Sequence, residues 1–224
     1  MKKIIALTLA LLMLTMSFVA CNKTEPETTT EPTDNQTEAP AGDTTVEETT
    51  EAVVELPYKS AIELLNIVFS GYNATATEET MLYVAGGNIY NFETVNQEGP
   101  AAFVALADTD YNENLGIPES EAAKIESAAS MFNMMNTNVF NCFTVQFKAG
   151  TDVDASINAI KENILARRWM CGAPEKLVIV KMPGDYILVV WGAVQFGGIV
   201  DPFAASIATL VEGATTVVEH NFAQ

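Results

Sequence analysis

The stretch from Asn22 to Glu55 limits what this chain can fold into, because it contains almost no apolar side chain that a core could bury. Threonine, glutamate, proline and aspartate dominate it, and ordering such a segment costs chain entropy that apolar burial does not offset. This composition predicts a disordered, self-repelling tether at residues 21–56. The folded part of the chain is therefore expected to be a single domain at residues 57–224.

A signal segment precedes the tether. Lys2 and Lys3 form a positive start, residues 4–19 are apolar apart from threonine and serine, and Ala20 is a small residue before a possible cleavage point. This arrangement is typical of a secretory signal. The apolar run is shorter than the ~20 residues that a membrane-spanning helix needs.

The end of that segment, Phe18-Val19-Ala20-Cys21, resembles a bacterial lipobox, although the lipobox prefers leucine where this chain has phenylalanine. The likeness implies a lipoprotein signal peptide at residues 1–20 and a diacylglyceryl group on Cys21. Acyl chains on that cysteine would hold the protein at the extracytoplasmic face of the cell membrane.

The charge balance restricts the partners of the chain. Eleven lysines and arginines against 29 aspartates and glutamates give a formal net charge of −18 at pH 7. A strongly acidic protein repels polyanions, so nucleic acid is not expected to bind. A protein, a peptide or a cell-wall component is the partner that we expect.

Beyond residue 60 the spacing of apolar residues predicts helices and strands in alternation. Helices are predicted at 60–72, 118–132, 151–164 and 201–212, strands at 139–147, 177–180 and 186–191, a strand or packed loop at 81–85, and a short helix at 101–107. From residue 117 the order is α-β-α-β-β-α. It predicts an α+β fold, with a small antiparallel or mixed sheet of about three strands and helices packed on one face.

Two cysteines, Cys142 and Cys171, remain once Cys21 carries lipid. The predicted elements place Cys142 in a strand and Cys171 just after a helix that packs on that strand, so a disulfide and two separate buried thiols both fit. A reactive Cys171 beside two arginines is a further hypothesis. The chain has no Cys-x-x-Cys motif to support this hypothesis, and the single histidine that could activate the thiol lies near the C-terminus.

A partial calcium motif occupies residues 108–119. Asp108, Asp110, Asn112 and Glu119 fall at the first, third, fifth and twelfth positions of a calcium-binding loop. Glu113 stands at the sixth position, where the sharp turn of that loop needs glycine. We interpret the stretch as an acidic loop before a helix, and we expect neither a metal site nor a cofactor.

Two groups of side chains fit either a surface or a core. Met131, Met134 and Met135 suit a peptide-binding groove or ordinary packing. Trp169, which follows two arginines, suits an exposed recognition patch or a buried ring. The chain offers no coherent catalytic set, so we expect a binding protein and not an enzyme.

Several segments resemble those of a known family. They are residues 129–138, 166–180 and 184–186, together with Leu64-Leu65-Asn66 and Gly86-Gly87, and the likeness covers residues 60–212. The chain is similar to uncharacterised lipoproteins of anaerobic Gram-positive bacteria, clostridial gut commensals above all. The resemblance implies a cell-surface lipoprotein with an α+β domain of unknown function, and it supplies no catalytic residue. Some relatives carry a label linking them to bacteriocin transport, so an accessory role in an exporter stands as an alternative, beside a thiol-based redox protein or enzyme using Cys171.

Overall fold

The computed structural model describes residues 55–134, 139–169, 172–195 and 197–223. Cys21, the predicted signal peptide and almost all of the predicted tether lie outside these residues, and the predictions made for them stay predictions. The elements are α1 (Ala61–Asn73), β1 (Val84–Ala85), β2 (Ala101–Ala102), η1 (Leu106–Asp108), α2 (Tyr111–Leu115), α3 (Glu119–Ala122), β3 (Ile125–Asn133), β4 (Asn141–Phe147), α4 (Val153–Leu165), β5 (Lys176–Met182), β6 (Tyr186–Gly192), α5 (Val200–Leu210) and β7 (Thr215–Asn221). None of these helices has the length and apolar character needed to cross a membrane.

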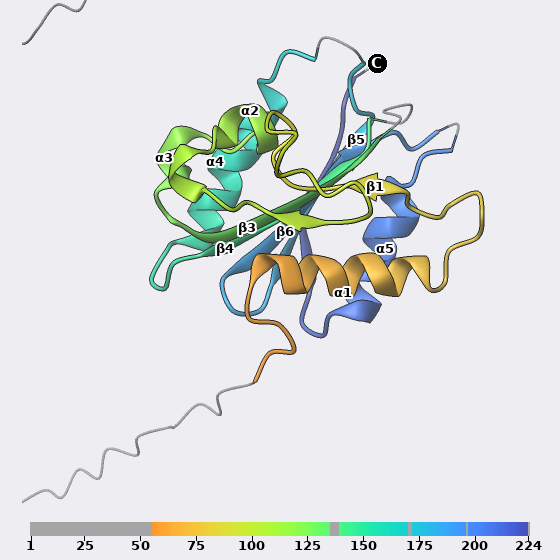
Figure 1. The fold of residues 1–224 in the computed structure, drawn as a ribbon, viewed down its shortest axis with the longest axis horizontal. Coiled ribbons are helices and arrows are strands. Elements are labelled where there is room, and N and C mark those ends of the chain that lie inside the picture. The colour runs from red at the N-terminus through yellow and green to blue at the C-terminus, as the bar shows by residue number, and fades with distance from the viewer. Residues whose placement is uncertain (1–54, 135–138, 170–171, 196, 224) are drawn as a thin grey trace, which may run out of the picture. The chain divides into compact units, whose positions relative to one another are not determined.

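The centre of the domain is a seven-stranded antiparallel sheet with the order β1-β3-β4-β6-β5-β7, in which β2 also pairs with β3 (Figure 1). The prediction of about three strands was therefore wrong. The three predicted strands are β4, β5 and β6, which lie side by side, and the other four extend this centre on both sides. The hairpin of β5 and β6 is confirmed, since Met182 pairs with Tyr186 across the turn at 183–185.

Strand β3 corrects the helix predicted at 118–132. Only Glu119–Ala122 is helical, and the chain then enters the sheet. The spacing of apolar residues matched that of a helix because β3 lies inside the sheet, where both of its faces are covered and apolar residues occur on both. Residues 128–131 are all buried, so the alternation that marks a half-exposed strand is missing. The short helix predicted at 101–107 was also wrong, since this stretch contains β2 and the start of η1.

Helices cover both faces of the sheet, in contrast to the predicted single face (Figure 1). One core lies under α1 and α5, and a second lies under α2 and α4. Successive side chains of a strand point to opposite faces, so Cys142 lies in the first core and Phe143 in the second. Strands β5 and β6 are almost wholly apolar and bury both faces, which requires a layer of helices on each side.

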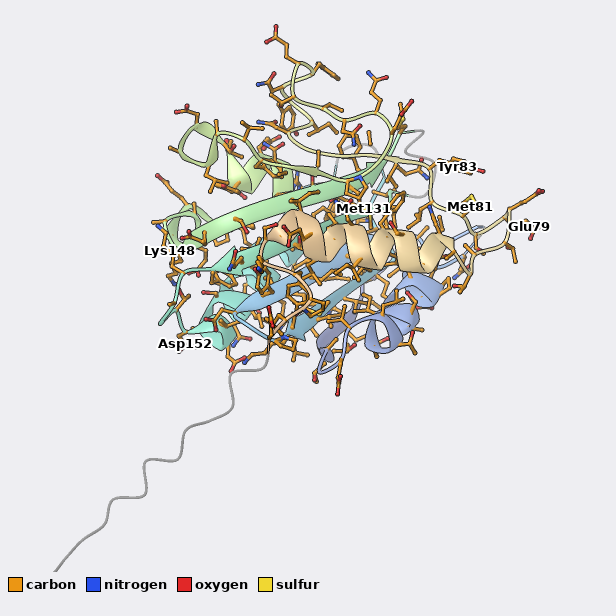
Figure 2. The ribbon with its side chains drawn as sticks, turned by 60° about the horizontal axis from the view of Figure 1, so that its bottom comes forward. Glu79, Met81, Tyr83, Met131, Lys148 and Asp152 are labelled. Atoms are coloured by element: carbon orange, nitrogen blue, oxygen red, sulfur yellow. The ribbon has the colours of Figure 1, made fainter. Side chains whose placement is uncertain are left out.

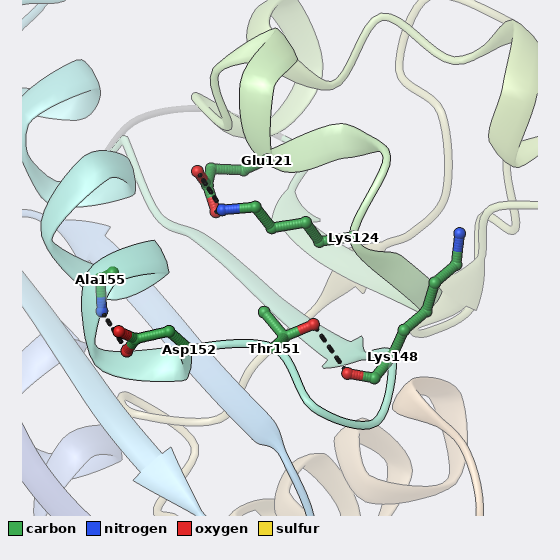
Figure 3. Close-up of polar contacts among 6 residues, drawn as sticks. All are labelled: Glu121, Lys124, Lys148, Thr151, Asp152 and Ala155. Carbon is green, nitrogen blue, oxygen red and sulfur yellow. Dashed lines mark hydrogen bonds and ion pairs between the residues drawn. The ribbon is translucent and has the colours of Figure 1, made fainter. Parts of the chain in front are cut away.

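Side chains cap the first turns of two long helices. Ser60 caps α1, with its side chain accepting from the amide of Glu63. For α4 the sequence predicts a capping box of Thr151 and Asp154, and this prediction was wrong. Helix α4 is capped by Asp152, whose carboxylate accepts from the amide of Ala155, and not by Thr151, whose hydroxyl donates to the carbonyl of Lys148 (Figure 3). Aspartate is a strong N-cap because its side chain satisfies an amide that the first turn leaves free.

The sequence predicts Asp201 as the N-cap of the last helix and Pro202 as its first residue, but α5 begins two residues earlier. Val200 is its first residue, so Asp201 lies within the first turn and does not cap the helix. There its carboxylate accepts from Lys176 of β5, at 2.7 Å. Lys176 also pairs with Glu219 of β7, a strand that the sequence analysis did not predict. These two hydrogen bonds raise the pKa of the Lys176 ammonium group, and they tie the edge strand to the helix.

Candidate functional site

A cavity of about 400 Å³ opens at one edge of the sheet. Antiparallel pairing brings the end of β3, the start of β4 and the end of β6 to this edge. Phe132 pairs with Asn141, and Asn141 pairs with Trp191, so these side chains of three strands enter the lining together. The segment that follows α4 and the short helix α2 complete the wall. The volume lies within the range of about 300–1,000 Å³ that is typical of ligand sites.

Aromatic rings form much of this wall. Trp169 lies with its ring centroid 5.9 Å from that of Trp191 and 6.1 Å from that of Phe222, in edge-to-face contacts. The guanidinium of Arg167 lies over the Trp169 ring, 5.3 Å from its centroid, in a cation–π contact. Trp169 is half-buried. It is thus neither a free surface patch nor a core ring, the two readings that the sequence left open.

The two arginines of the chain play different parts here. Arg167 is held in place, because its Nη2 donates to the carbonyl of Glu113 at 2.8 Å and its Nη1 to that of Asn112 at 3.4 Å. Arg168 is exposed and makes no hydrogen bond or ion pair with any residue that the structure describes. The charged side chains of the wall are Arg167, Arg168 and Glu113, so the site is locally positive in a chain of net charge −18.

Three side chains of the wall carry a buried polar atom with no hydrogen-bond partner among the described residues. They are Oδ1 of Asn114, Oδ1 of Asn141 and Nε1 of Trp169. Asn114 is 6% exposed, and its Nδ2 donates to the carbonyl of Asp110 at 2.8 Å, which fixes Oδ1 as a free acceptor. A buried polar group without a partner destabilises a fold by about 1–3 kcal/mol, so native proteins contain few of them. Their concentration in one wall indicates a site that needs an outside partner.

The loop after β1 supplies the outer rim. Tyr90 is 58% exposed, and its hydroxyl donates to Oε1 of Glu113 at 3.1 Å. Partial burial, and then the neighbouring Glu113 carboxylate, raise the pKa of the Tyr90 hydroxyl. The loop is attached to β3 through Ser130, whose hydroxyl donates to the carbonyl of Gly87 and accepts from its amide. These hydrogen bonds hold the start of the loop against the sheet and so help to position Ile89 and Tyr90 at the rim of the cavity.

The partial calcium motif does not form a calcium-binding loop. Asp108, Asp110, Asn112 and Glu119 do line a second hollow, of about 440 Å³. However, helix α2 begins in the middle of the stretch, because the Asp110 carboxylate caps it and accepts from the amide of Glu113. Oδ1 of Asn112 accepts from Asn163. Within the described residues, no group of three or more His, Cys, Asp or Glu side chains is placed to hold a metal ion.

The cysteines give no support to a reactive thiol at position 142. Cys142 has no disulfide partner among the described residues, it is fully buried, and desolvation raises the pKa of its thiol well above the ordinary value. Its side chain lies on the α1 and α5 face of the sheet, whereas α4, the helix before Cys171, covers the opposite face. Cys171 itself lies outside the described residues, so a Cys142–Cys171 disulfide and two separate thiols both stand as alternatives.

The methionines divide between core and site. Met131 is fully buried in the core beneath α1 (Figure 2). By contrast, Tyr83, which is labelled in the same view on the segment before β1, is 70% exposed. Met134 is 55% exposed and lines the cavity, and Met135 lies outside the described residues. Asn114, Asn141 and Trp191 were not predicted as site residues. One signal was available in the sequence: both arginines and one of the two tryptophans are consecutive.

Comparison with protein-family models, curated proteins and solved structures gives no match to this chain. The geometry of the cavity therefore carries the functional inference. The resemblance to clostridial lipoproteins stays a prediction from the sequence.

Proposed function

We propose that this protein is a lipoprotein, anchored through Cys21 at the extracytoplasmic face of the membrane, whose domain binds a small ligand or a peptide segment in the cavity at the sheet edge. The role is binding and not catalysis. The observation that supports it is the group of three unpaired buried polar atoms in a wall of aromatic and arginine side chains. A ligand that supplies their hydrogen bonds recovers free energy that these atoms lose when the fold buries them unpaired.

The proposed tether suits such a role. A Thr-, Glu- and Pro-rich chain between Cys21 and the domain would extend, because its charges repel one another. The domain would then meet ligands at some distance from the lipid surface. The membrane contact would come from the acyl chains, since each buried methylene contributes about 0.8 kcal/mol.

Asn141→Leu tests the cavity. Leucine has the same number of side-chain heavy atoms and the same branching, and it removes the unpaired amide oxygen, so we expect the free energy of unfolding to stay unchanged or to rise by about 1 kcal/mol. Binding should be lost. Both tryptophans line the cavity, so intrinsic fluorescence reports ligand entry directly. The full chain is titrated with short peptides and with cell-wall fragments, and urea unfolding gives the stability.

Asn73→Leu is the matched control. Its amide donates to the carbonyl of Leu82 at 3.0 Å and accepts from the Leu82 amide at 2.9 Å, so it already has its partners. This substitution should destabilise the domain by about 2 kcal/mol and leave binding by the folded protein intact. A fluorescence signal that no probe of either class changes would contradict the binding role. A loss of stability in Asn141→Leu equal to that in Asn73→Leu would show that Asn141 is structural.

The anchor has its own test. The intact mass of protein extracted from its native membranes should equal that of residues 21–224 plus acyl groups. An unmodified chain, or a chain that begins elsewhere, would disprove the lipidation of Cys21. The same spectrum with and without reduction shows whether Cys142 and Cys171 are bonded.

A further inference from the structure

We infer that the cavity binds the free carboxyl end of a peptide, with Arg168 holding the terminal carboxylate and the asparagines contacting the backbone behind it. This inference rests on the binding role proposed above and names the ligand class of the same site. It follows from three properties of the wall, which are its charge, the polarity of its unpaired atoms and its aromatic rings.

The charge indicates a single negative group. Two arginines and one glutamate line the cavity, which leaves one net positive charge in a chain that is otherwise strongly acidic. Two of the N–H donors of Arg167 bind backbone carbonyls, whereas Arg168 has no hydrogen bond or ion pair with any described residue and can turn all its donors to a ligand. The planar guanidinium of arginine matches a carboxylate with two parallel hydrogen bonds. A phosphate group, with a charge of about −1.5 to −2, would match one net positive charge less well.

The unpaired atoms require both a donor and an acceptor from the ligand. Oδ1 of Asn114 and Oδ1 of Asn141 are acceptors, whereas Nε1 of Trp169 can only donate. A peptide unit carries one N–H donor and one carbonyl acceptor, and the terminal residue adds a carboxylate. All three atoms are buried, so the side chains of Asn114, Asn141 and Trp169 must rotate before a ligand can reach them. A neutral sugar could supply donors, but it would leave Arg168 without an anion.

The rings indicate an apolar terminal side chain. Half-buried Trp169 lines the cavity with almost fully buried Trp191 behind it, and Tyr90, Ile89 and Met134 extend apolar surface to its rim. Aromatic walls with a few placed polar groups are typical of sites that fix both the position and the orientation of a ligand. A terminal phenylalanine or leucine would pack against the tryptophans while its carboxylate reaches Arg168.

The test compares two peptides that differ only in terminal charge. Acetyl-Ala-Ala-Phe with a free carboxylate and the same peptide with a terminal amide are titrated into the full chain, with tryptophan fluorescence as the signal. The free acid should bind at least about tenfold more tightly than the amide, as expected for loss of a charge-assisted hydrogen bond. Arg168→Gln should weaken binding of the acid to the level of the amide and leave binding of the amide unchanged.

Lys59→Gln is the control, because it removes one positive charge from an exposed residue outside the cavity. It should leave the preference for the acid intact. Equal binding of the acid and the amide, or an acid preference that survives in Arg168→Gln, would overturn the inference. So would binding of glucuronic acid or of neutral cell-wall sugars in the absence of peptide binding, although that result would still support a ligand site. Failure of every probe would instead disprove the proposed function itself.

Discussion

Replacing Phe203 by alanine should lower the free energy of unfolding by about 3–5 kcal/mol, the range for a buried phenylalanine. Phe203 belongs to α5 and is fully buried. Its ring centroid lies 5.3 Å from that of Tyr72 in α1 and 5.6 Å from that of Phe140 before β4, both in edge-to-face contacts. One side chain thus joins both helices of this face to the sheet. Alanine would leave a cavity that none of these elements can close without moving.

Urea unfolding of the variant, followed by circular dichroism, measures the effect. Phe92→Ala is the matched control, because the same atoms are removed from a ring that is 83% exposed. A surface substitution of this kind should change the free energy of unfolding by no more than about 0.5 kcal/mol. Similar losses in the two variants would show that α5 does not pack on the sheet as described.

Gly86→Ala should destabilise the domain by about 3 kcal/mol, the upper end of the usual range for overpacking. A methyl group at this position would lie within 3.0 Å of three backbone atoms, the amide nitrogen of Ala101 and the carbonyl oxygens of Ser130 and Gly99. Backbone in a sheet cannot rotate away as a flexible side chain can. The pair of hydrogen bonds between Gly86 and Asn96, at 2.8 and 3.0 Å, would be displaced with it.

Gly86→Ala should also weaken ligand binding in the cavity. The segment after Gly86 carries Ile89 and Tyr90, which line the cavity, so its displacement should weaken ligand binding as well as stability. Gly150→Ala serves as the control, because its methyl group would meet no atom within 4 Å. Gly150 has a φ of 82°, so alanine there carries backbone strain alone, about 1 kcal/mol. Equal effects of the two substitutions would mean that the chain around Gly86 adjusts freely.

Local patterns in the sequence were enough to locate several elements. Helices α1 and α4 each bury a stripe with three-to-four spacing, and β4 alternates apolar residues and is followed by Gly150. The hairpin of β5 and β6 follows from two apolar runs around a proline–glycine turn. Each of these signals depends on residues close together in the chain, and local packing preference and tertiary structure agree there.

The remaining strands depend on contacts between distant residues. Strand β1 pairs with β3 across some fifty positions, as in the pairing of Ala85 with Phe132, and its two residues carry no periodicity. Strand β3 is buried on both faces, so apolar and polar residues do not alternate along it, and its apolar spacing matched that of a helix. Strand β7 is an exposed edge, held by its pairing with β5 rather than by an apolar face.

By itself the sequence determined that helices and strands alternate beyond residue 60 and that both arginines precede a tryptophan; the signal-like start and the tether stay predictions. The tertiary structure alone decided the number of strands, the helices on both faces and the cavity. Antiparallel register brings Asn141 beside Trp191, and α4 delivers Trp169 to the same edge. Whether an asparagine is paired depends on neighbours that only folding supplies. The unpaired amide oxygens of Asn114 and Asn141 therefore became visible only in the folded domain.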